Sequence, residues 1–300
     1  MPLNWPDTER DLFGENLNQG HHDLHTRDAF SDAGLADILD RFPREHLGIY
    51  AFPHLTSGIS KPSHGTADGV PGKHLLEAVK QGHIWLNLRG ASHHLDDIAT
   101  METEVFSALD AASGKRSFKR DVGLLISSPN VHVNYHLDIT MVTLIQIRGE
   151  KRVWLYPTED AFASPEAIEA IALRECEEDV AYDPAFDEAA TQITLTPGKM
   201  ITWPQFAPHR VQNGNMLNVS LSCEFLTWPA WVRANEVYAN GVLRRRAGWA
   251  PNYVKDLTPA SFAKAGLSRL IKASHNVPTS PPTTATFQID SASAGGVRAL

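Results

Sequence analysis

The middle of the chain consists of short runs of aliphatic, β-branched and aromatic residues, separated by turn sequences such as Ser-Pro-Asn and Arg-Gly-Glu. Runs of this kind between turn signals are typical of consecutive antiparallel strands. A segment with helical periodicity, 164–175, divides them into two blocks. The first block comprises 121–128, 131–138, 141–148 and 151–157, and the second comprises 192–204, 209–214 and 215–225. Two strand blocks around an insertion favour a barrel over alternating βαβ units, so we predict a mainly β fold with flanking helices and a double-stranded β-helix (jelly-roll) core.

The rest of the chain is predicted to surround this core. Residues 1–120 form a mixed, helix-rich region that packs on the barrel, and they include a helix within 29–43 that Ser31 can cap and Pro43 ends. Residues 121–227 form the core, and 228–275 form C-terminal helices. The segment 276–300, rich in Pro, Ser, Thr and Ala, is expected to be a flexible tail. Further helices are predicted at 72–82, 96–113, 229–248 and 258–275, and a further strand at 83–90.

Composition excludes several classes of protein. Hydrophobic residues make up 42% of the chain and charged residues 21%, as in ordinary globular proteins. The 35 acidic residues against 27 basic ones give a net charge of -8, which repels a phosphate backbone, so no nucleic-acid partner is expected. The two cysteines, Cys176 and Cys223, cannot form a disulfide framework. No run of residues resembles a signal or membrane-spanning segment, so we expect a soluble, cytoplasmic protein with no membrane partner.

Three His-x-Asp triplets occur, beginning at His21, His94 and His136. A metal site needs both side chains on the same side of a rigid backbone. On a strand, residues i and i+2 share a face, so His136 and Asp138 can both point into a barrel. The first triplet lies in a polar loop and the second opens a helix, where residues two apart diverge by roughly 200°. The alternative for the third pair is an internal hydrogen bond.

A third ligand has to come from the second strand block. His209 begins a strand there, after a Pro-Gly turn and an apolar strand. Two histidines and one carboxylate on one face of an iron ion leave three positions open for a co-substrate and oxygen. Lys151 begins a strand of the first block, where an inward-pointing cation would be costly unless paired. It could bind the distal carboxylate of a 2-oxoacid; alternatively, Lys151 faces solvent and Arg152 points inward.

These residues resemble the JmjC-type, cupin-like branch of the Fe(II)- and 2-oxoglutarate-dependent oxygenases, in particular its asparaginyl hydroxylase-like members, and also bacterial cupin-like proteins. The resemblance is carried by NYHLDITMVTLIQIRGEKRVWLYP at 134–157 and by the pattern W-P-x-x-x-P-H-R-V-x-N at 203–213, and it covers 123–225. It implies that His136, Asp138 and His209 hold Fe(II). It also implies that the lysine 15 positions beyond the first histidine, Lys151 here, binds the tail of 2-oxoglutarate.

The chain departs from this family at one position. Members often carry a threonine three residues before the first histidine, which donates a second hydrogen bond to 2-oxoglutarate, but this chain has Val133. Another donor must then replace it, and Asn134, Thr143 and Ser220 are the candidates.

The predicted activity is that of an Fe(II)- and 2-oxoglutarate-dependent dioxygenase that hydroxylates a C–H bond of a protein side chain or a small molecule. One alternative is a cupin-type dioxygenase that uses the metal without a 2-oxoacid, although such a site has no use for a buried lysine. The other is a metal-binding protein without turnover, acting as a sensor or binding module. The C-terminal helices could form a homodimer interface, as in some relatives.

Overall fold

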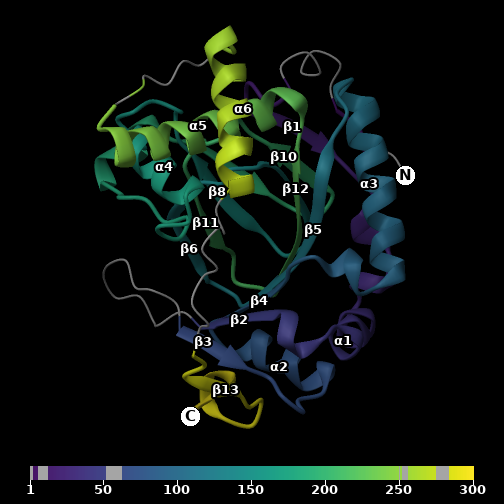
Figure 1. Cartoon of the computed structure of the whole chain (residues 1–300). Helices are drawn as coiled ribbons and strands as arrows, with labels where there is room; N and C mark the ends of the chain where they lie inside the picture. Colours follow the sequence, from purple (N-terminus) through teal and green to yellow (C-terminus); the bar gives the residue numbers. More distant parts are fainter. Residues whose placement is uncertain (1–2, 6–12, 52–62, 250, 252–255, 275–283) are drawn as a thin grey trace.

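The structure is a computed structural model that describes residues 3–5, 13–51, 63–249, 251, 256–274 and 284–300. Its helices are α1 (Asp32–Arg41), α2 (Gly72–Gln81), α3 (Asp96–Ser113), α4 (Pro165–Ala172), α5 (Trp228–Ala247) and α6 (Pro259–Ser274). Its strands are β1 (Asn18–His21), β2 (Leu47–Ala51), β3 (Ser63–Thr66), β4 (Ile84–Leu88), β5 (Phe118–Ser127), β6 (His132–His136), β7 (Met141–Arg148), β8 (Lys151–Leu155), β9 (Thr191–Leu195), β10 (Lys199–Thr202), β11 (His209–Asn213), β12 (Asn218–Leu226), β13 (Phe287–Ile289) and β14 (Val297–Ala299). Figure 1 shows their arrangement.

The strands form two sheets. The larger has ten strands in the order β1-β10-β7-β12-β5-β4-β2-β3-β13-β14, and the smaller has four in the order β6-β11-β8-β9. Every strand pair in the barrel is antiparallel, as expected for strands joined by short turns. Apolar side chains from both sheets form one cluster, in which Val142 and Leu144 of β7 join Val153 and Leu155 of β8. The two sheets therefore pack face to face as in a jelly roll.

Strand β5 shows how the period of two separates the hydrophobic core from the interior of the barrel. Val122, Leu124 and Ile126 belong to the main apolar core, which also contains residues of α2 and α3. Gly123, Leu125 and Ser127 alternate with them and line a cavity between the sheets. The main core therefore lies outside the barrel, between the large sheet and the helices of the first third of the chain (Figure 1).

The first third of the chain is joined to the barrel through the same sheet. Strand β4 pairs with β5, with Trp85 opposite Ser127, and β2 and β3 extend the sheet further. Helix α1 begins as predicted, because the Ser31 hydroxyl accepts a hydrogen bond of 3.1 Å from the backbone N–H of Gly34. In Figure 1, α1 and α2 lie beside β2–β4, and α3 runs along β5.

The C-terminal part adds two helices and a small hairpin. Lys264 on α6 forms an ion pair of 2.9 Å with the buried Glu236 on α5. Within 276–300, where a flexible tail is predicted, β13 and β14 pair with each other and β13 pairs with β3, while residues 275–283 lie outside the described part. Phe287 and Ile289 are buried in the main core, which gives this segment apolar side chains to pack. Among the described helices, none combines the length and the apolar character needed to cross a bilayer.

Candidate metal centre

The three predicted metal ligands lie together at one end of the barrel. His136 is the last residue of β6, Asp138 follows two residues later, and His209 is the first residue of β11. The two strands pair with His209 opposite His136, and the imidazole ring centroids are 4.1 Å apart. His209 Nε2 is 3.5 Å from Asp138 Oδ2, and ligand atoms of all three residues lie within 4.8 Å of one another.

An irregularity in β6 helps to aim these side chains inward. His209 on β11 pairs with His136 on β6, and Val211 pairs with Val133. Between these two pairs the chain advances by two residues on β11 but by three on β6. One extra residue in a strand is a β-bulge, which redirects side chains and is frequent beside active sites. Because of it, both Val133 and His136 line the interior although their odd spacing would place them on opposite faces of a regular strand.

Backbone carbonyl groups fix the orientation of both imidazoles. His136 Nδ1–H donates to the Asn134 carbonyl oxygen at 2.7 Å, and His209 Nδ1–H donates to the Ala207 carbonyl oxygen at 3.1 Å. The Nε2 lone pair of each ring then remains available for a metal, which is the usual arrangement of metal-binding histidines. Trp203 packs on His209 with 4.8 Å between ring centroids.

The electrostatics of the three ligands favour a bound cation. Burial, with the neighbouring carboxylates Glu178 and Glu224, raises the pKa of Asp138 well above its usual range. Burial, with the adjacent His136, lowers the pKa of His209 well below its usual range. The protein alone therefore holds a carboxyl group that resists ionisation beside an imidazole that resists protonation. A bound divalent cation would favour the ionised form of Asp138, because its positive charge stabilises a carboxylate. It would also bind His209 in the neutral form that burial already favours.

This donor set fits Fe(II). Two imidazole nitrogens and one carboxylate oxygen on one side of the ion form the facial triad of non-haem iron enzymes. Ligand atoms at adjacent corners of an octahedron with metal–ligand bonds of ~2.1 Å are about 3 Å apart, close to the 3.5 Å between His209 and Asp138. All three ligands face a cavity of about 110 Å³.

Both sheets and the first third of the chain form the walls of this cavity. Trp85, Asn87 and Arg89, from β4 and the residue after it, line one side. Sequence reasoning did not identify them, because only the pairing of β4 with β5 brings them to the site. Glu178 and Glu224, whose carboxylates influence Asp138, also line the cavity.

Lys151 lies at the other end of the same cavity. Its side chain is buried, and it lies directly opposite Asn213 in the ladder between β8 and β11. Asn213 is four residues beyond His209 on β11, which corresponds to about 13 Å along the strand. Within the described part of the chain, the ammonium group has no hydrogen bond or ion pair, and burial lowers the pKa of Lys151 to about 8. The structure thus places Lys151, rather than Arg152, at the cavity.

Two further polar side chains line the cavity near Lys151. Asn213 Nδ2 donates to Ser127 Oγ at 2.8 Å and to the Ser128 carbonyl oxygen at 2.9 Å. Ser127 is buried and lines the cavity, and its oxygen already accepts this bond, so its hydroxyl hydrogen is available to another acceptor. Neither residue was singled out from the sequence, because a buried serine and asparagine carry no motif of their own.

The structure places the three residues predicted to replace the missing threonine elsewhere. None of them is among the described residues that line the cavity. Asn134 is half-buried on β6, inside the bulge between Val133 and His136. Thr143 is fully buried on β7, on the face opposite that of Val142 and Leu144. Ser220 donates its hydroxyl to Gln146 Oε1 at 2.8 Å. Contacts of these residues with 2-oxoglutarate therefore remain predictions.

Comparison with solved structures shows which fold this is. No family model matches the chain, and no curated protein matches its sequence. The chain is similar to the X-ray structure of E. coli ycfD, with a TM-score of 0.52 and 18% sequence identity over 92% of this chain and 69% of that chain. It is also similar to a crystal structure of the Escherichia coli ribosomal oxygenase YcfD, with a TM-score of 0.51 and 18% identity over 92% of this chain and 68% of that one. The predicted jelly-roll fold is confirmed, whereas the asparaginyl hydroxylase-like resemblance stays a prediction.

Proposed function

We propose that this protein is an Fe(II)- and 2-oxoglutarate-dependent oxygenase that hydroxylates a C–H bond. The observation that carries the proposal is one cavity with His136, Asp138 and His209 at one end and Lys151 at the other, buried and without a partner among the described residues. A metal alone explains the triad but not the lysine. A dicarboxylate that reaches from the metal to Lys151 explains both, because it supplies the negative charge that the buried ammonium lacks.

In this proposal His136, Asp138 and His209 hold the iron, which, with 2-oxoglutarate and oxygen, supplies the oxidant for hydroxylation. The chain itself contributes position. The Asn134 and Ala207 carbonyl groups keep both imidazoles in the neutral, metal-binding tautomer. Trp203 restricts rotation of His209, and the apolar walls formed by Val133 and Leu144 exclude water from the interior.

The distal carboxylate of 2-oxoglutarate would bind Lys151 and Ser127. The Ser127 hydroxyl takes the role that the family gives to a threonine at the position of Val133, since Asn213 occupies its lone pair and leaves its hydrogen free. The Lys151 ammonium supplies the charge and the hydroxyl supplies a directed hydrogen bond.

The substrate would be a polar group that enters beside the triad. Arg89 and Glu178 are exposed and Glu224 is half-buried where they line the cavity, so both signs of charge are available for recognition. The name of the similar structure, ribosomal oxygenase, supports a protein side chain as the substrate rather than a small molecule.

The test is anaerobic addition of Fe(II) and 2-oxoglutarate to the purified protein. We expect a weak visible charge-transfer absorption and, on admission of oxygen, conversion of 2-oxoglutarate to succinate. His136→Ala and Asp138→Ala should lose both signals while retaining the circular dichroism spectrum of the folded protein. A wild-type protein that binds Fe(II) but shows no absorption change with 2-oxoglutarate would contradict the proposal and favour the 2-oxoacid-independent dioxygenase or the binding module.

A further inference from the structure

Strand pairing fixes two of the three metal ligands but not the third. His136 and His209 lie opposite each other in the ladder between β6 and β11. Asp138 lies beyond the end of β6, in the loop that leads to β7, so strand pairing does not fix its carboxylate. A facial metal site requires all three ligand atoms at set distances from one another. Contacts outside the strands must therefore hold the loop of Asp138 against the loop of His209.

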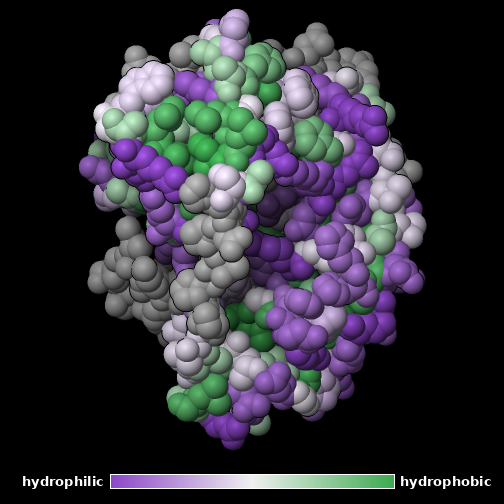
Figure 2. Space-filling view, in the orientation of Figure 1, coloured by the Kyte–Doolittle hydropathy of each residue, from purple (hydrophilic) through white to green (hydrophobic). Residues whose placement is uncertain are grey.

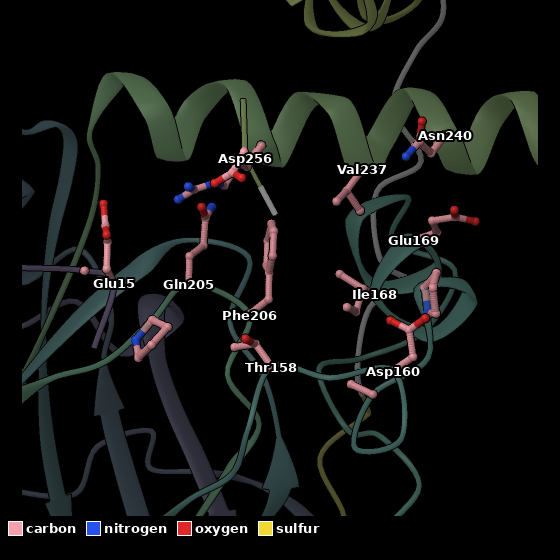
Figure 3. Close-up of a pocket in the computed structure, with 15 residues that line it drawn as sticks. Glu15, Thr158, Asp160, Ile168, Glu169, Gln205, Phe206, Val237, Asn240 and Asp256 are labelled. Atoms are coloured by element: carbon pink, nitrogen blue, oxygen red, sulfur yellow. The ribbon is translucent and has the colours of Figure 1, made fainter. Parts of the chain in front are cut away.

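The side chain of Gln205 provides such a contact. It is 7% exposed, and its amide nitrogen donates to the Ile139 carbonyl oxygen at 2.7 Å and to the Ala230 carbonyl oxygen at 3.1 Å. Ile139 is the residue after Asp138, and Gln205 lies four residues before His209. Figure 3 shows the Gln205 side chain at the edge of a cavity of about 230 Å³, reaching from its loop towards α5, whose first turn contains Ala230. One amide group thus joins both ligand loops to α5.

Gln205 also belongs to a strained turn just before His209. Gln205 and Phe206 are the central residues of a β-turn in which the Ala207 N–H donates to the Pro204 carbonyl oxygen at 3.1 Å. Phe206 has a φ of 67°, in the left-handed region, where glycine or asparagine is usual and a bulky side chain is strained. Such a conformation persists only where surrounding contacts impose it, as the two amide hydrogen bonds of Gln205 do. The Ala207 carbonyl group, at the end of this turn, orients the imidazole of His209.

Another side-chain hydrogen bond reaches the Asp138 loop, but it does not join the two ligand loops. Thr140 Oγ1 donates to Glu224 Oε2 at 3.3 Å, and Glu224 lies on β12 rather than in the loop that carries His209. The bond from Gln205 to the Asp138 loop is shorter, and it begins in the His209 loop itself. The relative position of the two ligands therefore depends on Gln205 more directly than on Thr140.

We propose that Gln205 is a positioning residue that sets the distance between the Asp138 carboxylate and the His209 imidazole, and thereby the affinity and the geometry of metal binding. The pattern W-P-x-x-x-P-H-R-V-x-N leaves this position variable, so the family resemblance assigns it no role. The inference rests on the metal site of the proposed function, but not on the use of 2-oxoglutarate.

The test is titration of the metal-free protein with Co(II), whose visible absorption bands depend on ligand geometry. Gln205→Met keeps the length of the side chain but removes both N–H donors. We expect its dissociation constant for Co(II) to rise about tenfold or more, as is typical for residues that orient metal ligands, and its absorption bands to change in position or intensity. Gln205→Ser, too short to reach Ile139, should have the same effect and serves as a second variant if the methionine variant does not fold.

Asn235→Leu is the matched control. Asn235 is a buried amide, 5% exposed, whose hydrogen bonds in the described part of the chain lie within α5 and α6. Its replacement should lower the thermal stability but leave the Co(II) dissociation constant within about twofold of the wild-type value. A role of Gln205 in stability alone would give this same result for the Gln205 variants.

Gln205→Lys tests whether the donor itself matters. An ammonium group can donate to both carbonyl oxygens, and Figure 3 places Glu15 and Asp256 on the same side of the cavity, where they can compensate its charge. It should recover most of the Co(II) affinity. The proposal is overturned if the methionine and serine variants bind Co(II) with wild-type affinity and spectrum, if the lysine variant binds as weakly as they do, or if Asn235→Leu weakens binding equally. A wild-type protein whose Co(II) spectrum does not respond to 2-oxoglutarate would contradict the proposed function but not this inference.

Discussion

The buried ammonium group of Lys151 has no partner among the described residues, so the proposed binding of 2-oxoglutarate should depend on pH. Burial lowers its pKa to about 8, so above that pH the free protein holds a neutral amine. Binding of a carboxylate requires the ammonium form. The dissociation constant for 2-oxoglutarate should therefore be flat below pH 8 and rise about tenfold per pH unit above it.

Anaerobic absorption titrations between pH 6.5 and about 9.5 measure this dependence. Lys151→Arg keeps the positive charge throughout that range, because a guanidinium does not deprotonate there. We expect the arginine variant to bind more weakly at pH 7 because of its different shape, but with an affinity that does not fall between pH 8 and 9.5. A wild-type affinity that is equally insensitive would show that Lys151 does not contact the co-substrate.

Ser127 and Ser220 offer a direct comparison between the donor that the structure favours and the one predicted from the sequence. Both serines are buried, but Ser127 lines the cavity whereas the Ser220 hydroxyl is bonded to Gln146. Loss of a hydrogen bond to a charged group costs about 1.5–3 kcal/mol, so Ser127→Ala should raise the KM for 2-oxoglutarate about tenfold or more with little change in kcat.

Ser220→Ala should leave the KM for 2-oxoglutarate within about twofold of the wild-type value. Adding Val133→Thr to Ser127→Ala restores a hydroxyl at the family position and should recover part of the affinity. The opposite ranking of the two serine variants would return the role to Ser220.

At the scale of elements, the link between α4 and α5 depends on one buried carboxylate. Glu169, with a side chain 3% exposed, accepts from Arg244 Nε at 2.8 Å and from Arg245 Nη1 at 3.2 Å. Removing both arginines leaves a buried charge unpaired, which costs about 3–5 kcal/mol. Glu169→Gln should cost less, about 1–2 kcal/mol, because the partly exposed guanidinium groups can be hydrated.

Urea unfolding of the Arg244→Ala/Arg245→Ala variant and of Glu169→Gln measures the two free energies of unfolding. Arg246→Ala, on the exposed end of the same helix, is the control and should change stability by no more than about 0.5 kcal/mol. Equal destabilisation by the double variant and by Glu169→Gln would mean that charge burial does not govern this contact.

Elements with a local signal were predictable from the sequence, and those defined by distant partners were not. The helix at α1 has a capping serine and a terminating proline, and the strands of the two blocks have turn signals at both ends. Strands β1 and β3 are only four residues long and contain a glycine, so their identity depends on strands far away in sequence. The same holds for the site: the ligand triad carries a motif, whereas the bulge in β6 and the wall from β4 arise only when the strands pair.

At the scale of the whole molecule, the ten-stranded sheet runs without interruption from the barrel into the first third of the chain. Trp85 and Asn87 reach the cavity through this continuity. The region predicted as 1–120 therefore contributes directly to the metal-site cavity. Its boundary with the core at residue 121 stays a prediction.

The C-terminal helices leave apolar side chains on the surface, which favours the predicted homodimer. Trp228 on α5 is 58% exposed, and Phe262 and Leu270 on α6 are 46% and 71% exposed. Figure 2 shows a hydrophobic patch in the upper part of the molecule, where Figure 1 places α5 and α6. Contiguous exposed apolar surface is uncommon on monomers, and a two-fold symmetric contact would bury the same patch on both copies.

Sedimentation equilibrium at micromolar concentrations should therefore give twice the mass of the chain. Leu270→Glu combined with Phe262→Glu should give a monomer, because two carboxylates per copy would have to be buried against apolar surface. Met216→Glu is the matched control, since Met216 is 58% exposed but precedes β12, away from both helices. A monomeric wild type, or a double variant that still dimerises, would exclude this face as the interface; unchanged succinate formation by the monomeric variant would further show that the metal site is complete within one chain.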